Sequence, residues 1–181
     1  MTDIARLPVS RFTEADADRA HAEWGCNCGP GALAGICGLS LDGVRPFMGD
    51  FESKGYTNPT LMLDCLRRLE ASGIRWTKAK DQSAWPSYGL ARIQWEGPWT
   101  APKVPPRVAY RHTHWVGACV HTRNDVGIFD INCVSNGTGW VSLKGWTDLI
   151  VPVLLENVPK ASRKWHITYV IEVTLPVATR Q

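Results

Sequence analysis

The stretch Asn27-Cys28-Gly29-Pro30-Gly31-Ala32-Leu33-Ala34 decides how the rest of the chain is interpreted. Pro30 suits the first turn of a helix, because the N–H that proline lacks would have no partner there. The small residues that follow, as far as Gly38, predict a helix that packs tightly against its neighbours. Cys28 is therefore expected at the beginning of a buried helix.

Helical signals continue until Gly73. Asn58 is a typical helix N-cap and Pro59 a typical first helical residue, and an apolar stripe follows at helical spacing. These signals predict a helix over residues 59–71. Shorter helices are expected around residues 46–48 and over 16–24, and residues 146–155 are expected to form a helix or a helix plus a strand.

Alternating apolar and polar residues after Gly73 predict a sheet. The expected strands are 74–77, 90–95, 114–120, 126–131 and 166–174. The third and fourth should form a hairpin around a turn at 124–125. Helices first and an antiparallel sheet second define an α+β fold with its two halves packed face to face. We expect one domain over 1–181, with residues 1–20 as an N-terminal arm.

Composition excludes several classes of protein. A net charge of +3 over 181 residues, with no run of five or six like charges, argues against a nucleic-acid or membrane partner. No signal peptide and no apolar segment of about 20 residues is present, so a cytoplasmic protein is expected. In that compartment the six cysteines should be reduced thiols, and we expect no cofactor and no metal. The oligomeric state is left open.

Cys28 is the candidate nucleophile. A helix N-terminus carries partial positive charge and free backbone N–H groups, which favour a thiolate over a thiol. The same N–H groups can stabilise the oxyanion that forms when a thiolate attacks a carbonyl. Gly29 allows close backbone approach, and the amide of Asn27 is a further candidate donor.

His114 and His112 are the candidate bases. In the sequence Arg111-His112-Thr113-His114-Trp115, alternation along a strand would place both histidines on one side. An imidazole at the start of this strand can reach the helix mouth if helix and sheet pack face to face. Either histidine can serve as the base, and the neighbouring Trp115 is a candidate for substrate binding.

Asp130 and Asn132 are the candidates for a third member of the site. They would share one face of the strand after His114, in the hairpin described above. Either side chain can accept a hydrogen bond from the histidine and fix its tautomer. A structural role at the end of the strand is the alternative for both.

These residues together resemble the papain-like cysteine peptidase superfamily, in which Cys, His and then Asn or Asp follow one another. The chain is most similar to the bacteriocin-leader-processing branch, with its Cys-Gly-Pro-x-Ala-Leu-Ala helix start, its His-Trp/Phe-Val strand and an Asp about sixteen residues later. The resemblance spans residues 24–135. It implies a papain-like fold, with Cys28 as nucleophile, His114 as base, and Asp130 as the orienting residue, with Asn132 as its alternative.

The chain departs from that family at one position. The family places a Gln six residues before the cysteine as an oxyanion donor, and Ala22 stands there in this sequence. This departure leaves room for a weak enzyme, a transferase or an inactive homologue.

Three functions are therefore in competition. The first is hydrolysis of a peptide, isopeptide or related amide bond in a peptide or protein substrate, through a thioester acyl-enzyme. Deamidation and acyl transfer would use the same three residues. The second is a metal-dependent hydrolase built on His112, His114 and Asp130. The third is a papain-like binding module without catalysis, which would use the Trp- and Pro-rich loop at 95–106.

Overall fold

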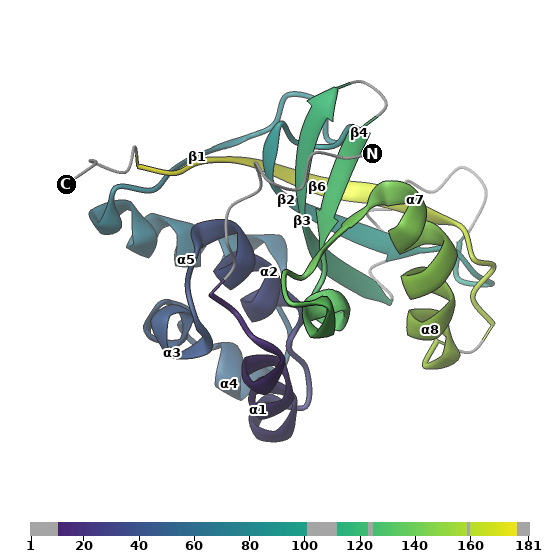
Figure 1. The fold of residues 1–181 in the computed structure, drawn as a ribbon, viewed down its shortest axis with the longest axis horizontal. Coiled ribbons are helices and arrows are strands. Elements are labelled where there is room, and N and C mark those ends of the chain that lie inside the picture. Colours follow the sequence, from purple (N-terminus) through teal and green to yellow (C-terminus); the bar gives the residue numbers. More distant parts are fainter. Residues whose placement is uncertain (1–10, 101–111, 123–124, 159, 177–181) are drawn as a thin grey trace.

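The computed structural model describes residues 11–100, 112–122, 125–158 and 160–176. The fold is α+β, with a six-stranded antiparallel sheet and helices on both of its faces (Figure 1). Within the described ranges, no helix is both long and apolar enough to cross a bilayer. Residues 101–106 of the Trp- and Pro-rich loop expected at 95–106 lie outside these ranges.

The helices of the first half follow their sequence signals. The helix expected over 59–71 is confirmed as α5 (Pro59–Leu69), capped by Asn58 and continued by a 3-10 turn. The buried helix is α2 (Cys28–Cys37), and Gly38 ends it in the left-handed conformation with φ of 67°. The remaining helices of this half are α1 (Glu14–Trp24), α3 (Leu41–Val44), the 3-10 helix η2 (Arg45–Phe47) and α4 (Phe51–Lys54).

Of the N-terminal arm expected over 1–20, residues 1–10 lie outside the described residues, and residues 11–20 include the start of a helix. Thr13 and Asp16 form a reciprocal capping box, which starts α1 at Glu14. Phe12 is buried in the main core. The described part of this segment therefore belongs to the domain itself, because Thr13 caps α1 and Phe12 packs in the core.

The sheet contains the expected strands in the order β1-β6-β2-β3-β4-β5. The short strand Trp140–Ser142 was not expected. The strands are β1 (Arg75–Lys78), β2 (Tyr88–Trp95), β3 (Thr113–Thr122), β4 (Asp125–Phe129), β5 (Trp140–Ser142) and β6 (Trp165–Thr174). The predicted hairpin is confirmed as the pairing of β3 with β4.

The strand expected over 126–131 ends at Phe129. Asp130 instead caps the 3-10 helix η4 (Ile131–Asn136), and its side chain accepts the backbone N–H of Asn132. The prediction that Asp130 and Asn132 share a strand face is therefore wrong. The physical reason is that a short acceptor side chain favours the start of a helical turn over a continued strand.

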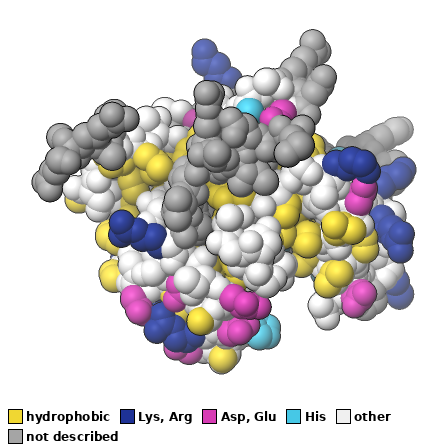
Figure 2. Space-filling view, viewed as in Figure 1, with side chains coloured by type: hydrophobic (Ala, Val, Ile, Leu, Met, Phe, Trp, Pro, Cys, Tyr) yellow, Lys and Arg dark blue, Asp and Glu magenta, His cyan; other side chains and the backbone are white. Residues whose placement is uncertain are grey.

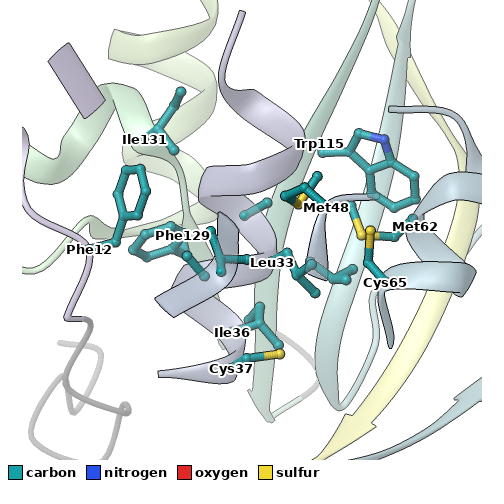
Figure 3. Packing of buried hydrophobic residues seen from close by; sticks show 14 of the residues in the cluster. Phe12, Leu33, Ile36, Cys37, Met48, Met62, Cys65, Trp115, Phe129 and Ile131 are labelled. Atoms are coloured by element: carbon teal, nitrogen blue, oxygen red, sulfur yellow. The ribbon is translucent and has the colours of Figure 1, made fainter. Parts of the chain in front are cut away.

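Two hydrophobic clusters lie on the two faces of the sheet. On the first face, α2 packs against β3, and Figure 3 shows Leu33 between Phe129 on one side and Met48 on the other. A Cβ at Gly35 would lie 2.2 Å from the Phe129 ring, so only glycine lets this helix approach so closely. The expected tight packing of α2 is thus confirmed.

The second face is covered by the chain after β5. This segment forms α7 (Leu143–Gly145), a π-helical turn (Trp146–Ile150) and α8 (Val151–Glu156), with Trp146 fully buried against the sheet. Residues 146–155 therefore form helix without a strand. Figure 1 shows α7 and α8 across the sheet from α1 to α5.

The surface carries charges of both signs in close pairs. Arg19 binds Asp16 and Asp42 at the end of the molecule formed by α1, where Figure 2 shows acidic and basic side chains side by side. Leu149 and Val153 are exposed apolar residues on the helix that covers the second face.

Candidate active site

Cys28 is the first residue of α2, and its half-buried side chain lines a cavity of about 1100 Å³. The residue before it, Asn27, occupies the N-cap position but makes no capping bond to the helix. The amide Nδ2 of Asn27 instead donates to the carbonyl oxygen of Ala17 at 3.0 Å. An N-cap side chain usually accepts a hydrogen bond from the first backbone N–H groups of its helix, but the Asn27 side chain bonds to α1 instead.

The side chain of His114 and the backbone N–H of Trp115 interact with the Cys28 thiol and favour its ionised form. Burial raises the pKa of this thiol, but the interaction with His114 and the charge of its ring outweigh burial. The pKa of Cys28 therefore lies below its ordinary value. A lowered pKa increases the thiolate fraction at neutral pH, which is the reactive form.

His114 is the second residue of β3 and is buried. Its Nε2 lies 2.8 Å from Oδ2 of Asp130, which leaves Nδ1 as the ring nitrogen that meets Cys28. Burial lowers the pKa of His114, but the carboxylate of Asp130 and the contact with Cys28 outweigh it and raise the pKa to about 10. The protonated form of the ring, the imidazolium, is therefore favoured beside Cys28.

Asp130 is buried, and both of its carboxylate oxygens accept hydrogen bonds. Oδ2 accepts the indole N–H of Trp146 at 2.7 Å as well as the bond from His114. Oδ1 accepts the backbone and side-chain N–H groups of Asn132 at 2.9 and 2.7 Å. Burial would raise the pKa of Asp130, but the charge of His114 and these bonds lower it to about 2. Asn132 thus orients Asp130, while Asp130 contacts the histidine.

Two tryptophans enclose the pair formed by His114 and Asp130. The ring of Trp95 stacks on His114 with centroids 6.4 Å apart and on Trp146 with centroids 6.0 Å apart. Both indoles are buried. They keep water from the ion pair, and a low local dielectric strengthens the interaction between its two charges.

Gly29 lies where another segment crosses the start of α2. A Cβ at Gly29 would be 2.1 Å from Oγ1 of Thr57. The carbonyl oxygen of Thr57 accepts the indole N–H of Trp115 at 2.8 Å, which ties this segment to β3. The hydroxyl of Thr57 is buried and has no hydrogen-bond partner among the described residues. Gly29 is therefore required by packing, and Thr57 and Trp115 both line the cavity.

His112 does not join the site. It precedes β3 with φ of 52°, is exposed, and packs its ring against Trp99 with centroids 4.6 Å apart. The prediction that His112 and His114 share a strand face is therefore wrong, because the strand begins after His112. Across the described part of the chain, no three His, Cys, Asp or Glu side chains are grouped so that they could hold a metal ion.

Ala22 lies on the exposed side of α1. The position that carries a Gln in the resembling family is thus part of a regular helix, and its methyl group can donate no hydrogen bond. The backbone N–H groups at the start of α2 lie beside Cys28, and they are the candidate donors to an oxyanion.

All six cysteines are free thiols. The pKa of Cys28 is lowered, whereas burial raises the pKa values of the other five. These are Cys26 and Cys119, with raised values, and Cys37, Cys65 and Cys133, with values of about 12. The site therefore singles out one thiol by its electrostatic surroundings.

Sequence reasoning did not identify Trp146, Trp95 or Thr57 as parts of the site. Nine tryptophans are scattered over the chain, and neither periodicity nor spacing distinguishes Trp95 and Trp146 from the rest. Thr57 directly precedes Asn58, the N-cap of the predicted helix. This position in the sequence does not indicate a contact with Gly29. These contacts depend on tertiary packing alone.

Comparison with known proteins leaves the geometry as the sole basis for a function. No protein-family model, no curated protein and no solved structure matches this chain. The contacts among Cys28, His114 and Asp130 are therefore the features of this chain that point to a function.

Proposed function

We propose that this protein is a thiol-dependent hydrolase that cleaves a peptide, isopeptide or related amide bond. One observation carries the proposal: His114 lies beside the Cys28 thiol and interacts with it, and Nε2 of His114 is held by the buried Asp130 at 2.8 Å. A nucleophile, a base and a residue that orients the base are the three parts of a triad. Their placement on a helix start, a strand and the turn after the next strand supports the papain-like resemblance.

The chemistry follows from these positions. The Cys28 thiolate attacks the carbonyl carbon, and the carbonyl electrons move to the oxygen, which the N–H groups at the start of α2 stabilise. The His114 imidazolium gives its proton to the leaving amine, and a thioester with Cys28 remains. Neutral His114 then removes a proton from water, and the resulting attack releases the acid and restores the thiolate.

Selective alkylation tests the proposal. Iodoacetamide should label Cys28 at neutral pH at least tenfold faster than Cys26, which lies two residues away and lines the same cavity but has a raised pKa. Mass spectrometry of digested protein gives the rate at each thiol, and Cys26→Ala provides a matched variant. Equal rates at Cys28 and Cys26 between pH 6 and 8 would remove the basis for a nucleophile.

The binding module is the second candidate, and the absence of a side-chain donor at the exposed Ala22 favours it. In that case the cavity would hold a peptide without turnover. A peptide library incubated with wild-type protein and with Cys28→Ala separates the two functions. Products that appear with the wild type alone support hydrolysis, whereas binding by both proteins without products supports the module.

A further inference from the structure

A buried hydroxyl without a hydrogen-bond partner lies beside the start of α2. Thr57 is only 8 % exposed, and its Oγ1 makes no hydrogen bond among the described residues. Buried polar groups in proteins are nearly always hydrogen-bonded, and an exception calls for an explanation. Because Thr57 lines the cavity in front of Cys28, a ligand in this cavity is a candidate partner for the hydroxyl.

Two contacts hold Thr57 close to Cys28. A Cβ built on Gly29 would lie 2.1 Å from Oγ1 of Thr57, so the hydroxyl packs against the residue that follows the nucleophile. The carbonyl oxygen of Thr57 accepts the indole N–H of Trp115 at 2.8 Å, and the backbone N–H of Trp115 interacts with the Cys28 thiol. Trp115 therefore connects the segment that carries Thr57 to the nucleophile.

The free N–H groups of α2 lie next to this hydroxyl. Pro30 has no N–H, and the N–H of Gly31 donates to the carbonyl oxygen of Asn27 at 2.9 Å. The N–H groups of Cys28 and Gly29 come before this first helical bond, so the helix itself leaves them without an acceptor. An oxyanion that forms on the carbonyl attacked by Cys28 is an acceptor for such groups.

The side chains that the sequence offers as further donors do not serve this purpose. The amide of Asn27 donates to the carbonyl oxygen of Ala17 at 3.0 Å, and Ala22 carries only a methyl group. The hydroxyl of Thr57 has a proton to donate and no hydrogen bond to give up. Rotation about its Cα–Cβ bond can therefore turn it towards an oxyanion without the loss of an existing bond.

We propose that Thr57 is a catalytic residue whose hydroxyl donates a hydrogen bond to the oxyanion formed when Cys28 attacks a carbonyl. This inference rests on the proposed function, because it adds a residue to the same reaction. As the carbon–sulfur bond forms, the π electrons of the carbonyl move to its oxygen, and the hydroxyl joins the N–H groups of α2 around that oxygen. When the carbonyl forms again, the leaving group departs with the electron pair of the broken bond.

Two reagents separate this role from the reactivity of the thiol. p-Nitrophenyl acetate acylates a thiolate through a tetrahedral oxyanion and releases coloured p-nitrophenolate, whereas iodoacetamide alkylates the same thiolate by displacing iodide, without an oxyanion. Thr57→Val keeps the shape of the side chain but loses the hydroxyl. We expect acylation of Cys28 in this variant to slow about 10- to 100-fold and alkylation to stay unchanged. Rates measured with Cys28→Ala correct for the other thiols.

Stability gives a second readout, which a structural role of the hydroxyl would not produce. Thr57→Val removes a buried polar group that has no partner, so its melting temperature should equal or exceed that of the wild type. Thr77→Val is the matched control, because Thr77 is exposed in β1 and does not line the cavity. Its ratio of acylation to alkylation should equal that of the wild type. A wild-type ratio in folded Thr57→Val, or equal slowing of both reactions, would overturn the proposal.

Thr57→Ser and Thr57→Ala decide the matter if Thr57→Val does not fold. Both lack the methyl group of threonine, and Thr57→Ser alone keeps the hydroxyl. The ratio of acylation to alkylation should stay close to that of the wild type in Thr57→Ser and should fall in Thr57→Ala. Equal ratios in these two variants would contradict the role of Thr57. Rapid alkylation of wild-type Cys28 tests the nucleophile separately, so an unchanged ratio together with rapid alkylation leaves the hydrolase proposal intact.

Discussion

Trp146 and His114 share one oxygen of Asp130. The indole N–H and the ring Nε2 lie 2.7 and 2.8 Å from Oδ2, and they approach from helix and strand respectively. Two donors on one oxygen prevent the carboxylate from rotating away from the imidazole. The orientation of the base therefore depends on a tryptophan that lies in a π-helical turn.

Replacement of Asp130 by Asn should inactivate the protein while preserving its fold. The negative charge that raises the pKa of His114 would be lost, and the imidazolium would no longer be favoured beside Cys28. We expect the activity, measured as cleavage of a peptide found by the library screen, to fall by about 10²- to 10⁴-fold. Asn132→Ala should have a smaller effect, because it removes bonds to Asp130 without removing the charge. An Asp130→Asn protein with full activity would contradict this role.

The Trp146→Phe variant should show what the indole N–H contributes. The ring stays in place, but Oδ2 of Asp130 loses one donor, so the pKa of Asp130 should rise. The free energy of unfolding should fall by about 1–2 kcal/mol. Alkylation of Cys28 should slow severalfold at pH 5, where the ion pair would be weaker. Trp165→Phe is the control, since Trp165 packs edge-on against Trp146 with centroids 5.6 Å apart. Identical pH profiles for the two variants would show that the indole bond is dispensable.

The pH dependence of stability should report the ion pair. The pKa of His114 rises from 6.5 to about 10, so its stabilisation is complete below pH 6.5 and is lost as the pH rises to 10. The pKa of Cys28 is lowered from 9.0, so its stabilisation is present above pH 9 and is lost as the pH falls. Between the lowered pKa of Cys28 and pH 9 the two slopes oppose each other and should largely cancel.

Cys28→Ser should expose the contribution of His114. Asp130 still raises the pKa of His114 in this variant, whereas the opposing slope of the thiol is gone. The free energy of unfolding, relative to the wild type, should therefore fall as the pH rises from 7 to 9, by up to about 1.4 kcal/mol per pH unit. Urea titrations at several pH values measure the difference. Parallel curves for the two proteins would show that the thiolate and imidazolium are not coupled.

Gly29→Ala should destabilise the start of α2. The new Cβ would lie 2.1 Å from Oγ1 of Thr57 and 2.5 Å from its Cβ, so either the helix or the crossing segment must move. Overpacking of this kind costs about 1–3 kcal/mol. Gly43→Ala in α3 is the matched control, because its new Cβ would meet neighbours at 3.4 Å or more. Thermal melting compares them, and equal melting temperatures would show that the segment yields freely.

The sequence predicts the helices and strands well where local signals are strong. Asn58 and Pro59 mark the start of α5, and alternation marks β3 and β6, because capping and pleating act over a few residues. Cys28, His114 and Asp130 could likewise be selected from the sequence, since their order and spacing resemble a known arrangement.

Tertiary contacts explain what could not be predicted. Strand β4 ends just before Asp130, because the Asp130 side chain accepts hydrogen bonds from Asn132 and Trp146. An alternation of apolar and polar residues does not reveal either contact. His112 has a positive φ and therefore lies outside β3, and its residue type alone does not indicate this conformation. Arg92 occupies a strand position like any other, and only the register with Trp115 shows that it faces the cavity.

The site joins the two halves of the core. Cys28 belongs to the layer between α2 and the sheet, whereas Trp95 and Trp146, which enclose His114, belong to the layer on the other side. A folding intermediate with a single layer in place would hold either the sulfur or the imidazole in position, but not both. Rapid labelling of Cys28 should thus be a property of the completed molecule. During stepwise denaturation, its decline would mark the moment when the first of the two layers comes apart.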